Sequence, residues 1–307
     1  KNTQPKYNPI HRDKIQGTWR LPEGFDTAVW NGPVRNNEFM QTCYACHSLR
    51  SPLSDGFNAD KPFLDQFTPS HVTPPFYYPD GQIKEEVYVY GSFLQSKMYK
   101  KGVNCLDCHD KHTMKVKIEG NSLCLQCHKA STFDTPMHHK HEQLSTGAQC
   151  VNCHMPDSVY MGVDNRRDHS FKVPRPDLSI QFQTPNSCIN CHKEQDNAWA
   201  AKTLEKWFGN PRKLSQSKKN LMALRHGKQL PLAEHLAIAD DVALSSIDRA
   251  SAIALLEPAS DSILFESFKK WLNSSEELIR LAAAQKASIL NSIQRKTLVS
   301  PLLDDPL

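Results

Sequence analysis

The last third of the chain carries apolar residues at the spacing of amphipathic helices. From about Ser215 onward Leu and Ala become frequent, and Gly227, Pro231, Pro258 and Pro301 interrupt the pattern. The segments between these breaks are predicted to be helices, and they cover residues 215–226, 231–240, 246–257, 260–272, 275–290 and 292–303.

A short repeat in this region indicates how its helices pack. Arg249-Ala250-Ser251-Ala252 and Arg280-Leu281-Ala282-Ala283 stand at matching places in two of the predicted helices, 31 residues apart. Small residues at repeated positions of paired helices favour an α-solenoid, with a simple helical bundle as the alternative. We therefore expect a HEAT-like helical repeat domain over residues 215–307. No polar capping repeat follows, so we expect this domain to be incomplete.

The first two-thirds of the chain lack such a pattern and are predicted to hold little regular secondary structure. Residues 1–42 are expected to form an irregular lead-in packed on the region that follows. Alternating residues predict a short strand at 87–90 and a β-hairpin at 115–121. Short helices are predicted at 92–100 and at 198–208, where Gly209 is a typical helix end. The fold class is thus mainly α.

All 10 cysteines of the chain belong to one recurring motif, Cys-x-x-Cys-His. Two thiols three residues apart on a helical turn can add to the two vinyl groups of one haem, and the next residue then places its imidazole under the iron. The five copies are Cys43/Cys46/His47, Cys105/Cys108/His109, Cys124/Cys127/His128, Cys150/Cys153/His154 and Cys188/Cys191/His192. The motif therefore predicts five covalently bound c-type haems and a pentahaem domain over residues 43–209.

Three other uses of paired cysteines fit less well. Zinc ribbons do not require a histidine after each second cysteine. A thioredoxin-like redox motif occurs once, beside a βαβ pattern that is not visible here. Five disulfides built from cysteines three residues apart would be an unusual framework.

Composition agrees with a core that is built partly from porphyrin. Hydrophobic residues make up 39% of 307 residues, a low share that apolar haem plates can offset. The formal charge of +4 gives no argument for nucleic acid, because each haem adds two propionate carboxylates. No apolar run reaches transmembrane length. Bacterial c-type haem is attached outside the cytoplasmic membrane, so we expect a periplasmic or extracellular location and a removed signal peptide or a longer parent chain.

The nine histidines outside the motifs include candidates for the second axial position of each iron. His112 is the best candidate, because it follows His109 too closely to serve its own haem. His138 and His141 form a local cluster that can supply one or two ligands. His169 stands in the interval before the fifth motif, where a returning ligand is expected. The fifth ligand is open between His71, His11 and Met98.

Other residues near these positions have expected roles as well. His226 and His235 fall in the helical tail and are expected to lie at the surface. The arginines near His169 are hypothesised to contact haem propionates, with solvated arginines as the alternative. They are Arg166, Arg167 and Arg175.

Several segments resemble the multihaem cytochromes related to cytochrome c554, over about residues 35–307. The segments are 86–98, Cys105-x-x-Cys108-His109-x-x-His112, Cys153-His154-Met155-Pro156, 160–164 and 166–171. Some members of that group carry HEAT or tetratricopeptide repeats at the C-terminus, and members usually have further haem motifs upstream. The resemblance implies an electron-transfer haem domain followed by helical repeats. The wider relatives include nitrite reductases, whose Cys-x-x-Cys-Lys site is not found in this sequence.

Two functions remain open at this point. The first is electron transfer along closely spaced haems, with the repeats docking a redox partner protein, another cytochrome subunit or further copies in an oligomer or filament. The alternative is a redox enzyme in which one haem keeps an open position for a small nitrogen or sulfur compound. Spare histidines favour full coordination and therefore the first function. A scaffold with haems as structural fillers is a weaker third reading.

Overall fold

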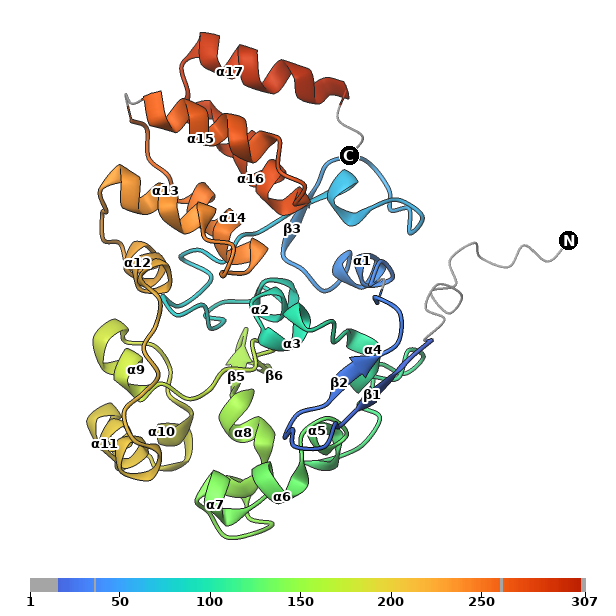
Figure 1. The fold of residues 1–307 in the computed structure, drawn as a ribbon, viewed down its shortest axis with the longest axis vertical. Helices are drawn as coiled ribbons and strands as arrows, with labels where there is room; N and C mark the ends of the chain where they lie inside the picture. The colour runs from blue at the N-terminus through green and yellow to red at the C-terminus, as the bar shows by residue number, and fades with distance from the viewer. Residues whose placement is uncertain (1–15, 36, 260–261, 305–307) are drawn as a thin grey trace, which may run out of the picture.

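The computed structural model describes residues 16–35, 37–259 and 262–304, and its regular structure is mainly helical (Figure 1). The motif-bearing segments occupy the lower and right-hand part of the view, and the tail helices are stacked above them. His11, one of the histidines considered as a ligand, lies outside the described residues. None of the described helices is long and apolar enough to cross a membrane.

The motif-bearing half consists of short helices and strands joined by irregular chain. Its strands form three antiparallel pairs, namely β1 (Thr18–Arg20) with β2 (Val29–Asn31), β3 (Arg50–Pro52) with β4 (Phe67–Pro69), and β5 (Asp157–Tyr160) with β6 (Asp164–Arg167). Its α-helices are α1 (Met40–Tyr44), α2 (Tyr90–Leu94), α3 (Lys97–Lys100), α4 (Cys105–Cys108), α5 (Ser122–Leu125), α6 (Ala130–Phe133), α7 (Pro136–His139), α8 (Cys150–His154), α9 (Pro176–Phe182), α10 (Ser187–Cys191) and α11 (Asn197–Phe208). Two 3₁₀ turns accompany them, η2 (Phe63–Asp65) and η3 (Thr146–Ala148).

Two predicted β elements in this half are wrong. Residues 87–90 make a single isolated bridge, between Tyr88 and Ser48, and α2 already begins at Tyr90. Tyr88 has a φ of 57°, a left-handed conformation that cannot continue a strand. Residues 115–121 likewise make one bridge, between Val116 and His109, and no hairpin. Residues 115–120 are all exposed, so the alternation there marks no buried face.

The predicted helices of this half are confirmed, one of them with a break. The segment 92–100 is divided into α2 and α3 at Ser96, whose side chain accepts a hydrogen bond from the backbone N–H of Tyr99 and starts the second helix. Helix α11 ends at Gly209, whose φ of 77° favours glycine.

Every helix predicted in the tail is present. The tail comprises α12 (Gln216–Arg225), α13 (Leu232–Asp240), α14 (Ser246–Ala254), α15 (Ser262–Leu272), α16 (Glu277–Lys286) and α17 (Ser292–Val299), with 3₁₀ turns η4 (Ala287–Ile289) and η5 (Ser300–Asp304). Helix α13 packs on α12 and α14, α15 packs on α16 and α17, and α14 packs along α16.

The two copies of the tail repeat occupy equivalent places in α14 and α16. Arg249 donates to the carbonyl of Ala239 at 2.8 Å, and Arg280 donates to the carbonyl of Ser274 at 2.7 Å, so each caps the end of the preceding helix. The alanines that follow are buried, which lets the two helices approach closely. They are Ala250, Ala252, Ala282 and Ala283.

The tail and the motif-bearing half share one apolar core. A single cluster of buried side chains runs from Phe39 through Leu94 and continues from Leu221 to Leu290. Backbone groups of Val72 tie the two parts together: its N–H donates to Ser251 at 2.9 Å, and its carbonyl accepts from Arg225 at 2.7 Å. The buried side chains of the two parts therefore form one continuous cluster.

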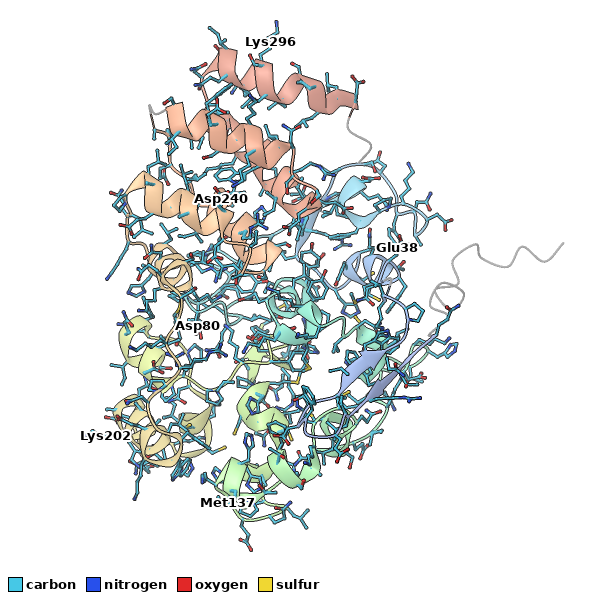
Figure 2. The ribbon with its side chains drawn as sticks, viewed as in Figure 1. Glu38, Asp80, Met137, Lys202, Asp240 and Lys296 are labelled. Carbon is cyan, nitrogen blue, oxygen red and sulfur yellow. The ribbon has the colours of Figure 1, made fainter. Side chains whose placement is uncertain are left out.

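A buried charge cluster reinforces this junction. Asp248 lies 2.7 Å from Arg225 and 2.8 Å from Lys218, and its side chain is 5% exposed. Burial alone would raise the pKa of Asp248, but the two cations hold it well below its usual range. Asp80 lies in the middle of the molecule between the two halves (Figure 2), and its backbone carbonyl accepts a hydrogen bond from the Lys172 side chain.

Candidate haem sites

Each Cys-x-x-Cys-His motif forms one helical turn with the same internal hydrogen bond. The backbone N–H of the motif histidine donates to the carbonyl of the first cysteine at 2.8–3.0 Å in His47, His109, His128 and His192. In the fourth motif His154 is itself the last residue of α8. The shared turn gives the two thiols and the imidazole of each motif a common arrangement.

Asparagine caps begin two of these turns. The side chain of Asn104 accepts from the N–H of Leu106, and the Asp107 carboxylate accepts from the N–H of Asn104 in a capping box. Arg35 and Trp19 both donate to Asp107, at 2.6 and 3.1 Å, so the lead-in before the first motif fixes the second motif. In the fifth motif Asn186 accepts from the N–H of Cys188 in the same way.

The third and fourth motifs are joined directly by one side chain. Asn121, at the start of the α5 turn, accepts a hydrogen bond from the N–H of Cys150 at 2.9 Å. Its amide also donates to Asp134 and to the carbonyl of Ala148. The sequence analysis did not single out Asn121, and only its position just before a motif could have drawn attention to it.

Sulfur atoms of consecutive motifs lie beside one another. The Cys43 and Cys105 thiols hydrogen-bond to each other, which lowers the pKa of Cys43 and raises that of Cys105. Cys124 and Cys150 are paired in the same way, with the pKa of Cys124 lowered and that of Cys150 raised.

The two remaining steps, between motifs two and three and between motifs four and five, show only an electrostatic influence of one thiol on the other. Burial raises the pKa of Cys108 to about 11, and nearby Asp107 and Cys127 add to this effect. Burial also raises the pKa of Cys153, with Cys191 as the next contributor. The motif helices α1, α4, α5, α8 and α10 accordingly follow an arc in chain order (Figure 1).

Three motif histidines each face a second histidine ring. The pairs are His109 with His169 at a centroid distance of 6.4 Å and an angle of 24°, His154 with His138 at 6.2 Å and 14°, and His192 with His141 at 6.1 Å and 33°. Imidazoles in van der Waals contact would stack more closely than this.

These separations match two imidazoles on opposite sides of one metal ion. A bond from a first-row metal to imidazole nitrogen is about 2.0–2.1 Å long, and the nitrogen lies roughly 1.1 Å from its ring centroid, so two such rings have centroids about 6.3 Å apart. The donor set therefore fits an iron held between each pair.

Hydrogen bonds fix the tautomer of four of the six paired rings. The Nδ1 atom of each lies within hydrogen-bond distance of a backbone carbonyl, which can only accept, so Nδ1 carries the proton. Nε2 then keeps a lone pair for a metal, the usual arrangement in metal-binding histidines. The partners are Met114 for His109 at 2.8 Å, Lys172 for His154 at 2.8 Å, Arg167 for His169 at 2.9 Å and His139 for His141 at 2.5 Å.

Burial keeps several of these rings neutral. It lowers the pKa of His169 and of His138, and in His138 the neighbouring His154 lowers the pKa further. Burial likewise lowers the pKa of His47 and His128 among the motif histidines. A neutral imidazole is the form that coordinates a metal.

The other predicted ligands lie apart from the motif histidines. His112 is exposed on a turn in which Asp110 accepts its backbone N–H, and no ring contact joins it to a described motif histidine. His71 points to the tail, with Nε2 3.3 Å from Gln285 of α16. Met98 is half-buried on α3. No pair of rings supports these three assignments.

The two tail histidines have different surroundings. His226 is exposed, as expected, with its ring edge against Phe182. The surface expectation for His235 is wrong: the residue is 7% exposed, and its Nε2 lies 2.8 Å from the carbonyl of Ala252 in the core between α13 and α14.

The three arginines near His169 are engaged by protein groups. Arg166 pairs with Glu86 and Asp164, and Arg175 binds Asp177 through two hydrogen bonds. Arg167 donates to Asn152 and to the carbonyl of Met155, both at 3.0 Å. Arg166 and Arg175 thus have carboxylate partners, whereas Arg167 contacts two neutral acceptors.

The candidate haem sites at the first and third motifs differ from the other three. His47 borders a cavity of about 290 Å³ whose lining includes Tyr88, Tyr160 and Arg166. His128 meets the edge of Phe133 at 5.4 Å. Within the described ranges, neither His47 nor His128 has a ring contact with another histidine. A mostly apolar cavity beside His47 suits the face of a porphyrin.

Tryptophans of α11 flank the fifth site. Trp199 lies 5.0 Å from His192, and Trp207 lies 6.5 Å from His141, measured between ring centroids. Both tryptophans lie in the helix predicted at 198–208 and were not among the predicted site residues. Their position just after the last motif was the available clue.

The structure gives no support to zinc or disulfide chemistry. All ten cysteines are free thiols. Among the described residues, no group of three or more His, Cys, Asp and Glu side chains converges in a way that could hold a metal ion. A haem site needs only one imidazole on each face, so this result leaves haem binding open.

Comparison with known proteins gives little further information. No protein-family model matches the chain, and no curated protein sequence matches it significantly. A solved structure similar to it is that of the outer cell wall cytochrome OcwA, with a TM-score of 0.42 and 16% sequence identity. The alignment covers 89% of this chain and 64% of the OcwA chain, so this chain spans less than two thirds of that protein's length. We draw no functional conclusion from a likeness at this level.

Proposed function

We propose that this chain binds five c-type haems and transfers electrons along them. One observation carries the proposal: the five Cys-x-x-Cys-His turns lie next to one another in chain order, and three of their histidines face a second imidazole at the spacing of a bridging metal. When bound, each haem supplies a reversible one-electron iron couple.

The protein's part in each site is attachment and axial ligation. The ten motif cysteines form the thioethers, and His47, His109, His128, His154 and His192 are the proximal ligands. His169, His138 and His141 are the distal ligands of the second, fourth and fifth sites. Their Nδ1 hydrogen bonds orient the rings of His169 and His141 and strengthen them as donors.

The order of the sites gives the electron path. Thiols hydrogen-bond between motifs one and two and between motifs three and four, and a thiol raises the pKa of a thiol in the neighbouring motif between motifs two and three and between motifs four and five. Cys46 and Cys191, in the first and last motifs, are exposed, whereas the other eight cysteines are partly buried. Electrons therefore enter at one end of the arc and leave at the other.

The remaining parts of the proposal concern the surroundings of this path. The tail, as a HEAT-like repeat domain, docks a redox partner protein, another cytochrome subunit or a further copy of the chain. The protein works in the periplasm or outside the cell, where c-type haem is attached.

The test begins with counting haems and then removes one ligand at a time. Intact mass should show five haems per chain. His169→Ala, His138→Ala and His141→Ala should each convert one low-spin haem to a high-spin haem in the electron paramagnetic resonance spectrum, because one axial ligand is lost. His226→Ala is the matched control and should leave the spectrum unchanged, since its exposed ring faces Phe182.

Two results would overturn the proposal. The first is a mass with fewer than five haems, or with zinc in their place. The second is a full set of low-spin signals in all three ligand variants, which would mean that the paired rings do not ligate iron.

A further inference from the structure

The segment 167–172 is bonded to the fourth motif near both of its ends. Near its start, the N–H of Asp168 donates to the carbonyl of Pro156 at 3.0 Å, just after the motif. At its end, the carbonyl of Lys172 accepts a hydrogen bond from Nδ1 of His154 at 2.8 Å. This second contact fixes the tautomer and the direction of the proximal histidine proposed for the fourth site.

The same segment carries the distal ligand proposed for the second site. His169 faces His109 at a centroid distance of 6.4 Å, and its Nδ1 lies 2.9 Å from the carbonyl of Arg167. Phe171 has a φ of 48°, a left-handed conformation that redirects the chain between His169 and Lys172. One short segment therefore orients an axial ring of the second site and an axial ring of the fourth, although the third motif lies between these two in the sequence.

A buried carboxylate holds this segment in place. Asp168 is 5% exposed, and both of its oxygens accept hydrogen bonds from backbone N–H groups. Oδ1 accepts from Ser170 at 2.7 Å, which closes a turn around His169. Oδ2 accepts at 2.9 Å from Ile83, on a distant part of the chain. Ser170 stands two residues before Lys172, so the same turn limits the movement of the Lys172 carbonyl.

We infer that Asp168 is a positioning residue for two haem sites at once, the second through His169 and the fourth through the carbonyl of Lys172. The inference rests on haem binding and on axial ligation by His169 and His154, as proposed above. It goes beyond that proposal because it makes the second and fourth sites respond together to one change, while the third site does not. The Asp168 carboxylate also stabilises the oxidised iron of the second site, since a nearby negative charge favours the more positive form.

The test compares the electron paramagnetic resonance signals of the oxidised protein that carries its haems. His169→Ala and His138→Ala identify the low-spin signals of the second and fourth haems, because each variant loses one of them. In Asp168→Asn both identified signals should shift, and the other low-spin signals should keep their positions. Movement of one identified signal alone, or equal movement of all the signals, would overturn the joint positioning.

The reduction potential of the second haem shows whether the charge of Asp168 acts on it. A redox titration can follow this haem through its identified signal. Asp168→Asn removes a negative charge at nearly constant size, so the potential should be higher than in the wild type. Asp168→Glu keeps the charge, and its potential should lie closer to the wild-type value. An unchanged or lower potential in Asp168→Asn would overturn the stabilisation of the oxidised iron.

Asp177→Asn is the matched control for the loss of one carboxylate charge. The Asp177 carboxylate accepts two hydrogen bonds from Arg175, at 2.6 and 2.7 Å, and lies outside the segment 167–172. This variant should leave both identified signals and the potential of the second haem as in the wild type. Shifts equal to those of Asp168→Asn would overturn the assignment to Asp168.

A measurement on the wild-type protein guards against a variant that fails to fold. Low-spin reduced haems are diamagnetic, so amide hydrogen exchange of the reduced protein can be followed by nuclear magnetic resonance. The N–H groups of Ile83 and Ser170 should exchange slowly, because Asp168 accepts a hydrogen bond from each. The N–H of the exposed residue Lys111 provides the fast reference. Exchange at Ile83 or Ser170 as fast as at Lys111 would overturn the inference.

The ligand variants also separate this inference from the proposed function. If His169→Ala and His138→Ala leave every haem low-spin, the proposed ligands are wrong, and both proposals are overturned. If these two variants behave as expected but Asp168→Asn moves neither identified signal, only the inference about Asp168 is overturned.

Discussion

Single hydrogen bonds separate the histidines that are free to bind a metal from those that are not. In the cluster of α7 the Nδ1 of His141 meets the carbonyl of His139 and keeps Nε2 free. The Nδ1 of His139 instead accepts the backbone N–H of His141 at 3.2 Å, so its neutral ring carries its proton on Nε2. Two histidines two residues apart therefore hold opposite tautomers.

We predict that His139→Ala leaves all haems low-spin. Its ring has its lone pair already committed to a backbone N–H, and its Nε2 bears the proton, so it has no site for iron. The measurement is the electron paramagnetic resonance spectrum of the oxidised variant, compared with that of His141→Ala. A new high-spin signal in His139→Ala would contradict the tautomer argument.

Replacing a single buried residue, Asp248→Asn, should destabilise the protein by about 3–5 kcal/mol, because Arg225 would keep a buried charge without its partner. The Arg225 side chain is 0% exposed. Denaturant unfolding measures the change. Asp26→Asn is the control: Asp26 and Lys129 are 3.6 Å apart and about half exposed, so the loss should stay below about 1 kcal/mol.

The Asp248 carboxylate also sets a direction for acid stability. Its pKa in the folded protein lies below the value of about 3.9 expected in the unfolded chain, so its contribution is complete above that pH and is lost as pH falls through the folded pKa. Below about pH 4 the wild type should lose stability more steeply than Asp248→Asn. Parallel pH profiles would show that this pair is not responsible.

At the scale of elements, α14 is held to the motif-bearing half by Ser251. Ser251→Ala should cost about 1–3 kcal/mol, because the N–H of Val72, a residue that is 0% exposed, would lose its acceptor. Unfolding by urea measures this. Ser217→Ala, at a half-buried position of α12, should change stability by less than about 0.5 kcal/mol. Equal effects of the two changes would rule out a special role for the Val72 contact.

The tail helices could be predicted from sequence because their signals are local. Apolar residues at helical spacing and breaks at Gly227 and Pro258 are sufficient to define α12–α17. The strand expected at 87–90 failed because Tyr88, which lines the cavity beside His47 but is 37% exposed, has a left-handed φ that cannot continue a strand.

The motif positions were readable from the sequence, and His138, His141 and His169 were named as candidates, but the motif histidine that each one faces was not. Cys-x-x-Cys-His specifies a turn by itself, but His169 reaches His109 across two intervening motifs. His112 looked suitable by sequence distance, yet the Asp110 turn keeps it at the surface. The spacing of residues in the sequence does not show in which direction an irregular segment runs back toward a motif histidine.

At the scale of the whole molecule, we predict that a chain ending before Ser215 keeps the spectrum of five haems but unfolds more easily. The ligands proposed here all lie before residue 209, so the spectrum of the loaded protein should not change. The apolar surface of 39–94 would lose its cover from α12 and α14, which lowers stability. Thermal unfolding followed by circular dichroism measures this, with the full chain as reference.

Two outcomes of the truncation would contradict the prediction of an unchanged spectrum and lower stability. A lost haem or a shifted spectrum would mean that the tail supplies a ligand. An unchanged unfolding temperature would mean that the two halves are stable independently, despite the shared core.

The three facing pairs of imidazoles also make the chain a set of overlapping closed loops. A metal bound between His109 and His169 would close a loop of chain that contains the third and fourth motifs. A metal bound between His141 and His192 would close a second loop that overlaps the first in sequence. Such cross-links reduce the entropy of the unfolded chain much as disulfides do, by about 4 kcal/mol for a loop of this size in the chain-entropy model. A molecule with short helices and little sheet can thus be rigid because its ligands divide a long irregular chain into small rings.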